Sequence, residues 1–380
     1  MKNKNINLKF LGKTRHLLDS AGLTSFISSF SAIIIGLLFG LLILIITNPS
    51  QAFAGFITIL SGGFTGGAKG IGNIFYIATP LIMTGLSVGF AFKTGLFNIG
   101  ASGQLIVGAY VSVLIGVRCT GLGSVQWVFA LLGGMTAGAV WGTIPGILKA
   151  FLNVHEVISS IMMNYIGMHL VNILVVHTVF DKLRNQSLTV AKTSFIPSMG
   201  MDTLFKGSSL NAGFFIAIIC AVIIFIILSR TVFGYELVAC GHNMEASRYA
   251  GINAKRNVVL SMSIAGALAG IAGSLMFLAE TGKHIVVIDV LAGEGFMGIP
   301  VALLGLSHPL GIILSALFIG YITQGGFYMQ LYDFVPEIID IIISSIIYFS
   351  AFALIIKRFV EHIKRRMDRK LAGVSGNREA

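Results

Sequence analysis

Charged residues are scarce in this sequence. Only 11% of its 380 residues are Asp, Glu, Lys or Arg, whereas about 25% is usual in soluble domains. Hydrophobic residues make up 55% of the chain, and apolar runs long enough to cross a bilayer recur from one end to the other. These runs do not alternate polar with apolar residues, which argues against a transmembrane β-barrel. We therefore predict an all-α polytopic membrane protein.

Cysteine is also rare, and the residue groupings that enzymes need are missing. Cys119, Cys220 and Cys240 lie far apart without metal-ligand spacing, so we expect neither a disulfide framework nor a metal site. The sequence has no H-E-x-x-H motif, no paired carboxylates and no Ser/His/Asp constellation. It also lacks G-x-x-x-x-G-K-[ST], the phosphate-binding loop of ATPases. We expect no catalytic residues and no cofactor in this chain.

Ten apolar runs predict transmembrane helices. They cover residues 26–46, 71–92, 94–116, 125–148, 157–180, 211–228, 258–279, 290–306, 310–328 and 338–356. Residues 61–72 read as a glycine-rich connector, and the 280–298 region allows a re-entrant or broken helix in place of a plain span. The chain is thus divided into an N-terminal segment (1–25), a transmembrane domain (26–356) and a basic tail (357–380).

A possible signal-peptidase site, Ala52-Phe53-Ala54, follows the first apolar run. That run has 21 residues, whereas the apolar core of a signal peptide has about 7–15. We expect the first span to stay uncleaved.

The positive charges are divided unevenly between the two sides that ten spans define. With both termini in the cytoplasm, cytoplasmic segments hold 19 of the 26 Lys and Arg residues: five in 1–25, Lys93, Lys149, four in 229–257 and eight in the tail. Cytoplasmic loops usually carry this excess. The long polar segment 181–210 is then outside. The net charge of +11 thus reflects topology, and we expect no nucleic-acid partner.

The polar segment 234–253, GYELVACGHNMEASRYAGIN, separates two long apolar runs. Asn243 suits a helix N-cap, Glu245 the first turn, Arg248 the last turn and Gly251 a left-handed residue after the helix. These positions predict one short helix over 244–250. A helix this short is marginal in water, which favours a docking element held by a partner. The alternative is a solvated loop that only joins two spans.

Glycines recur at four-residue intervals at 134, 138, 142 and 146, and again at 266 and 270. Small residues at this spacing let membrane helices approach closely. We interpret them as helix-packing positions.

Two neutral polar residues, Asn98 and Gln104, are candidates for a solute pathway. They can hydrogen-bond a base or a sugar without the cost of burying a charge. Further pathway candidates are Phe92, Phe97 and Phe296, whose rings could stack on a base, and Glu294. With 28 phenylalanines in the chain, packing is the usual role for any one ring.

An ion-coupled carrier that works alone is the main alternative function. Such carriers bury carboxylates that load the ion, but Glu156, Glu294 and Asp340 all fall near predicted span ends. His169 and His177 lie inside a span without a carboxylate at helical spacing, so we interpret them as hydrogen-bonding groups between helices. A purely structural membrane scaffold is a third possibility, which the Asn98/Gln104 pair argues against.

Three stretches resemble the permease subunits of ABC importers, in the branch that serves nucleosides and simple sugars. They are GLSVGFAFKTGLFNIGASGQ (85–104), GYELVACGHNMEASRYAGI (234–252) and GEGFMGIPVALLGLSHP (293–309). The second is similar to the cytoplasmic coupling loop of the family. Ser102 stands where an acidic residue is frequent, and Cys240 and Met244 are unusual in the loop.

This resemblance implies a multi-pass subunit of the bacterial cell membrane, with 26–356 as its permease domain. The implied partners are a second permease in a heterodimer, a cytoplasmic ATP-binding subunit that uses the ATP, and an extracellular or periplasmic solute-binding lipoprotein. A nucleoside is the expected solute. The implied ATPase-coupling residues within 229–257 are Gly234, Tyr235, Glu236, Gly241, Asn243, Glu245, Ala246, Arg248 and Gly251.

Overall fold

The computed structural model describes residues 21–281 and 283–352, together with 358 and 362. Within these residues the only sheet is a hairpin of β1 (Phe180–Asp181) and β2 (Gln186–Ser187). The long helices are α2 (Ala21–Thr47), α3 (Ala52–Thr65), α4 (Gly67–Lys93), α5 (Ala101–Arg118), α6 (Gln126–Leu152), α7 (Glu156–Thr178), α9 (Gly213–Arg230), α10 (Val232–His242), α12 (Ala254–Phe277), α15 (Pro309–Met329) and α16 (Pro336–Ala351). The short ones are η1 (Thr120–Val125), η2 (Lys192–Ser194), α8 (Met201–Leu204), α11 (Met244–Tyr249), α13 (Gly293–Phe296), α14 (Gly298–Leu304) and η3 (Gln330–Tyr332).

Seven helical segments of the described chain are long and apolar enough to cross a membrane. Shorter apolar helices cover Ser31–Thr47, Ala52–Thr65 and Gly293–Leu304. The prediction of an all-α polytopic membrane protein is therefore confirmed, whereas the number of ten spans stays a prediction. The predicted segments 1–25 and 357–380 fall largely outside the described residues.

The described residues form two compact units: 21–57 with 329–352, and 58–328 without residue 282. In the smaller unit, α2 packs against α16 through glycines that leave room for isoleucines. Gly40 of α2 faces Ile342, and the Phe39 and Phe349 rings lie 5.5 Å apart. This unit thus pairs a helix near each end of the chain.

The larger unit is built around α12, which packs against α4, α5 and α6. The α6–α12 contact is close because glycines meet there: a Cβ added at Gly138 would lie 2.7 Å from the Cα atom of Gly270. Beside it, the hydroxyls of Ser112 and Ser274 are 2.6 Å apart. The interpretation of the regularly spaced glycines as packing positions is confirmed.

The predicted connector 61–72 is wrong, because α3 continues to Thr65 and α4 begins at Gly67. Its glycines are compatible with helix because they are contact points: an added Cβ at Gly62 would clash with the backbone of Gly325 in α15. Only Gly67, with φ of +57°, interrupts the helical path. The glycines that suggested a loop therefore indicate close helix packing.

The predicted spans 94–116 and 290–306 are not continuous helices, so these predictions are also wrong. Residues 94–100 make a loop, and α5 begins only at Ala101. The left-handed Gly95 (φ +73°) ends the helical path after α4. The region before 305 has two short helices, α13 and α14, after a non-helical stretch that reaches Ala292. The broken-helix alternative is the one the structure has.

Candidate coupling surface and solute site

The segment between α9 and α12 folds into two helices, of which the sequence predicted only the second. α10 begins after Thr231, whose side-chain oxygen accepts a hydrogen bond from the Gly234 nitrogen at 3.0 Å. Gly234, Tyr235, Glu236 and Gly241 are therefore helical residues. Gly241 lies near the end of α10, where the absence of a side chain allows a close contact described below.

α11 has the ends that the sequence predicted. The Asn243 side chain accepts a hydrogen bond from the Ala246 nitrogen at 3.0 Å, which caps the first turn. The helix ends at Tyr249, and Gly251 follows in the left-handed region with φ of +83°. The Ile252 nitrogen donates to the Ser247 oxygen, which closes the C-terminal end.

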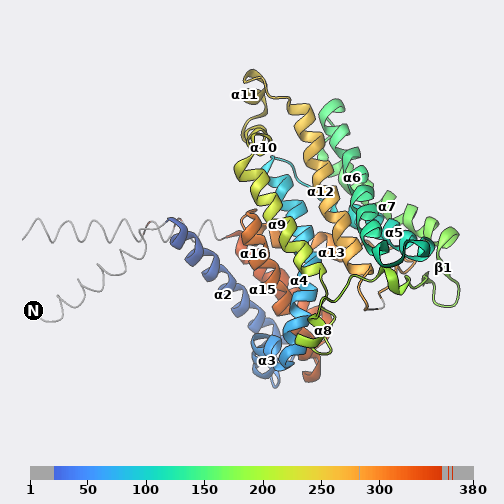
Figure 1. The fold of residues 1–380 in the computed structure, drawn as a ribbon. Coiled ribbons are helices and arrows are strands. Elements are labelled where there is room, and N and C mark those ends of the chain that lie inside the picture. Colours follow the sequence, from blue (N-terminus) through green and yellow to red (C-terminus); the bar gives the residue numbers. More distant parts are fainter. Residues whose placement is uncertain (1–20, 282, 353–357, 359–361, 363–380) are drawn as a thin grey trace, which may run out of the picture. The chain divides into compact units, whose positions relative to one another are not determined.

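α11 protrudes at one end of the larger unit, beyond α10 and the start of α12 (Figure 1). Glu245 and Arg248 form an ion pair of 2.8 Å within this one helix, and both side chains are exposed. Tyr249 is 93% exposed. α11, a helix of six residues, therefore presents these groups to the solvent.

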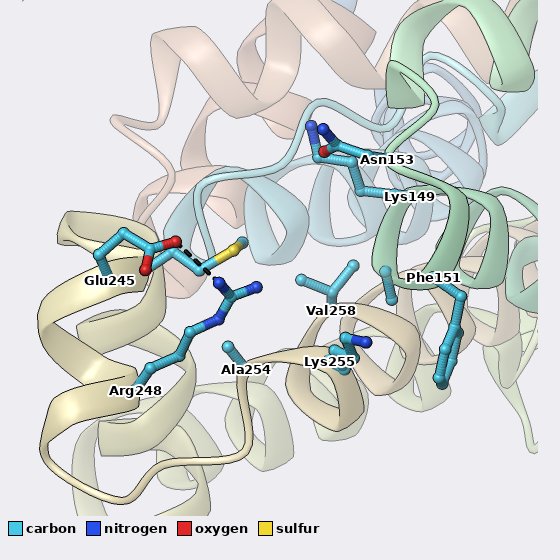
Figure 2. Close-up of a pocket in the computed structure, with 10 residues that line it drawn as sticks. Lys149, Phe151, Asn153, Glu245, Arg248, Ala254, Lys255 and Val258 are labelled. Carbon is cyan, nitrogen blue, oxygen red and sulfur yellow. Dashed lines mark hydrogen bonds and ion pairs between the residues drawn. The ribbon is translucent and has the colours of Figure 1, made fainter.

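A cavity of about 280 Å³ separates α11 from the end of α6 and the start of α12. Figure 2 shows Glu245 and Arg248 on one side of it and Phe151 on the other, with the Arg248 guanidinium directed into the space. Lys149 also lines the cavity, and the Lys255 ammonium lies 5.2 Å from the centre of the Phe151 ring. The charged residues of its walls are Lys149, Arg248, Lys255 and Glu245, so basic groups outnumber acidic ones.

α10 meets the loop 94–100 through two glycines. A Cβ added at Gly241 would lie 2.7 Å from the Gly95 nitrogen, so the two backbones touch without intervening side chains. Met244 packs beside them, against a cluster that includes Leu96 and Val258. The segment 229–257, called the coupling segment below, is thus in direct contact with the loop that leads into α5.

Glu236 links the same helix to α12. Its carboxylate accepts a hydrogen bond of 3.3 Å from the Asn257 amide, which also lies 3.7 Å from the Cys240 sulfur. Cys240 therefore has a packing role between α10 and α12, where it is 6% exposed.

The loop 94–100 is fixed by buried amides. Asn98 and Gln104 exchange two hydrogen bonds of 2.8 and 3.1 Å, and Asn98 donates a third to Ser87 at 3.0 Å. Asn164 of α7 donates to the Ile99 oxygen and accepts from a backbone N–H in the first turn of α5. Buried polar groups that are fully paired rigidify their surroundings.

The other pathway candidates lie in two places. Phe92 and Phe97 stack on each other, with ring centres 5.0 Å apart and planes 13° apart, and pack against the start of α5. Glu294 and Phe296 lie on α13, where Glu294 forms an ion pair of 3.1 Å with Lys283. Asn98 and Gln104 are at most 1% exposed in this structure. The pathway role of all six residues stays a prediction.

The sequence interpretation missed a polar contact between α7 and the stretch before α13. His169 has a carboxylate neighbour after all: Asp289 lies 3.4 Å away, far along the sequence and outside helical spacing. Asn172, one turn further along α7, donates to the Ile288 oxygen and to Asp289. Asparagines inside an apolar span are the signal that could have located this contact and that of Asn164.

The chain was compared with known protein families, curated proteins and solved structures. Residues 70–353 match the family model described as branched-chain amino acid transport system / permease component. The guanosine ABC transporter permease protein NupP of Bacillus subtilis is 37% identical over 88% of this chain and 95% of its own length. The nucleoside ABC transporter permease protein NupB of Lactococcus lactis is also 37% identical, over 86% and 90%.

A second Bacillus subtilis guanosine ABC transporter permease protein, NupQ, is 26% identical over 69% of this chain and 83% of its own length. No solved structure matches the chain significantly. The family match covers most of the chain, including the loop 94–100, the coupling segment and α13–α14. This chain therefore belongs to the branched-chain amino acid transport system permease family.

Proposed function

We propose that this chain is a membrane-spanning permease subunit of an ATP-driven importer for nucleosides. The observation that carries the proposal is the contact of α10 with the loop 94–100 at Gly241 and Gly95. Through it, a movement of the exposed α11 would reach the start of α5 without passing through flexible side chains. The names of the similar proteins NupP and NupB support a nucleoside as the solute.

The proposed topology has ten spans and both termini in the cytoplasm, with the coupling segment 229–257 on the cytoplasmic side. It is supported by α6, whose first residue, Gln126, bonds Thr193 of the 181–210 segment, while Lys149 near its other end lines the cavity beside α11. Single cysteines at the exposed Lys192 and Tyr249, in a cysteine-free background, should be labelled from opposite sides of the bacterial membrane. Labelling of both from outside would refute this topology.

The proposed assembly contains a second, different permease, a cytoplasmic ATP-binding subunit and a solute-binding lipoprotein outside the membrane. Bacillus subtilis has two proteins named guanosine ABC transporter permease, and this chain is 37% identical to NupP but only 26% identical to NupQ. We infer that its partner permease is of the NupQ kind. Purification through a tag on this chain should recover a second permease, and recovery of this chain alone would contradict the heterodimer.

The solute is tested by uptake into proteoliposomes that contain the whole importer. Labelled guanosine should be taken up, and excess unlabelled nucleosides should compete, whereas free ribose and glucose should not. Competition by sugars but not by nucleosides would assign the importer to simple sugars.

The alternative, an ion-coupled carrier, needs an ion-loading carboxylate in the membrane. Glu156, one candidate, is paired with Lys149 at 2.9 Å at the α11 end of the unit. Glu294 is paired with Lys283. Both carboxylates therefore have a cation partner, which favours a structural role over ion loading.

A further inference from the structure

Residues 283–292, which lead from the region after α12 to α13, pass through membrane depth without forming a helix. Its start is held by the hairpin, where Ser187 donates to the Ile285 oxygen at 2.8 Å. Further along, the Ile288 oxygen accepts from Asn172, six residues before the end of α7 at Thr178. At 1.5 Å per residue, this contact is about 9 Å below that end.

The lower end of the segment is fixed deeper still. The Ala292 oxygen accepts a hydrogen bond of 2.8 Å from Ser102 in the first turn of α5. The next residue, Gly103, donates to Asn164 of α7, which lies about 21 Å below Thr178 by the same rise per residue. Residues 288–292 therefore descend toward the middle of a bilayer whose apolar core is about 30 Å thick.

This stretch exposes both side chains and backbone. Ile288 is 49% exposed and Val290 is 67% exposed, and the Asp289 side chain is 77% exposed. Lipid tails do not accommodate non-helical backbone or a carboxylate, and such structures occur at this depth where they line water or are buried in protein. The stretch that carries Asp289 is therefore turned to an aqueous space or to a partner subunit, and not to lipid.

The polar groups near this stretch form two clusters. Asp289 is held by the His169 imidazole at 3.4 Å and the Asn172 amide at 3.3 Å, both through Oδ1. Lys283 and Glu294 form the second pair and line an adjoining cavity of about 330 Å³. That volume is within the usual range of small-molecule sites. Ile288 and Val290 line this cavity, whereas Asp289 between them contacts His169 and Asn172 of α7.

We propose that residues 283–292, with His169 and Asn172, form a wall of the solute path, and that Asp289 accepts hydrogen bonds from hydroxyl groups of an uncharged solute. This inference rests on the proposed importer function and names the site within it. Asn172 and His169 hold the carboxylate through Oδ1, which leaves Oδ2 for a hydroxyl group of the solute. The buried Asn98–Gln104 pair instead fixes the loop that the coupling segment contacts.

The aqueous wall is tested by cysteine accessibility in the complete importer. In a background with the three native cysteines replaced, Val290→Cys should react with a membrane-impermeant thiosulfonate added from outside, in the nucleotide-free or the ATP-bound state. Saturating guanosine should slow the reaction about tenfold. The control is Ile219→Cys on α9, which is 57% exposed and apolar and should not react. If Val290→Cys is as unreactive as the control in both states, the wall is covered and the proposal is wrong.

The carboxylate is tested by Asp289→Asn, which keeps the size of the side chain. Loss of a charged hydrogen-bond acceptor should raise the KM for guanosine uptake about tenfold, and Asp289→Glu should recover part of the loss. Unchanged KM in an assembled Asp289→Asn importer would overturn the recognition role. If the parental importer takes up no nucleoside, the proposed solute fails, while the thiosulfonate reaction still decides whether this wall is aqueous.

Discussion

Replacement of Gly241 by alanine is the sharpest perturbation of the proposed coupling route. The new Cβ would lie 2.7 Å from the Gly95 nitrogen and the Thr94 carbonyl carbon, and 2.8 Å from the Lys93 oxygen. All three neighbours are backbone atoms, so no side chain can rotate away. Because non-bonded carbon contacts are favourable near 3.5–4.0 Å, α10 and the loop must move apart by most of an ångström.

Overpacking of this kind costs about 1–3 kcal/mol. If the α10–loop contact transmits the ATPase cycle, the same free energy lost from coupling corresponds to a factor of about 5–150. We expect solute-stimulated ATP hydrolysis and uptake to fall together within that range, while the importer still assembles.

The assay measures ATP hydrolysis and guanosine uptake in the same proteoliposomes. Gly121→Ala is the matched control, because an added Cβ there has no described heavy atom within 4 Å, and it should behave as the parent. Stimulation and uptake at the parental level in an assembled Gly241→Ala importer would refute the reasoning. If Gly241→Ala fails to assemble, Gly95→Ala would be compared with Gly95→Asn: asparagine adopts the left-handed backbone at φ +73°, and both side chains add a Cβ to the same contact.

Three further outcomes are expected. Gly251→Val should impair coupling because the backbone φ is +83°, which a β-branched residue does not adopt; crowding is not the cause, since no described atom lies near an added Cβ. Gly251→Asn should be tolerated, since asparagine adopts left-handed backbone. Equal activity of the two variants would contradict this reasoning. Glu245→Arg should abolish solute-stimulated ATP hydrolysis. The variant should still fold, because the exposed pair with Arg248 contributes only about 0.2–1 kcal/mol to stability. If the variant's ATP hydrolysis is stimulated as strongly as the parent's, α11 is only a connector. Asn98→Leu should lower the melting temperature of the purified importer, because the buried Gln104 amide loses its partner at a cost of about 1–3 kcal/mol. An unchanged melting temperature would contradict a structural role for the pair.

The class of protein and the coupling helix could be predicted from local sequence. Apolar runs of span length follow from the bilayer alone. The ends of α11 follow from one capping residue, Asn243, and one left-handed residue, Gly251, both of which act within a few residues of the chain. These are short-range effects, so no knowledge of the tertiary structure was needed.

The rest depends on contacts between distant segments. From local sequence, Gly62 was expected in a connector, Gly95 in a span and Gly241 in a polar segment, but each meets the backbone of another segment closely. The partner of His169 is a carboxylate 120 residues away on a non-helical stretch, which helical spacing cannot indicate. The pairing of Asn98 with Gln104 was foreseen only as two polar residues in one apolar region, because their burial depends on how α4, α5 and α7 pack.

Measuring which energy source drives uptake tests most directly the claim that this chain is a permease of an ATP-driven importer. Proteoliposomes that contain this chain, its partner permease, the ATP-binding subunit and the binding protein should take up guanosine only when ATP is present on the side of α11. Uptake should persist when ionophores collapse the proton and sodium gradients. Uptake that stops with the gradients while ATP remains would contradict an ATP-driven permease and support a carrier driven by ions.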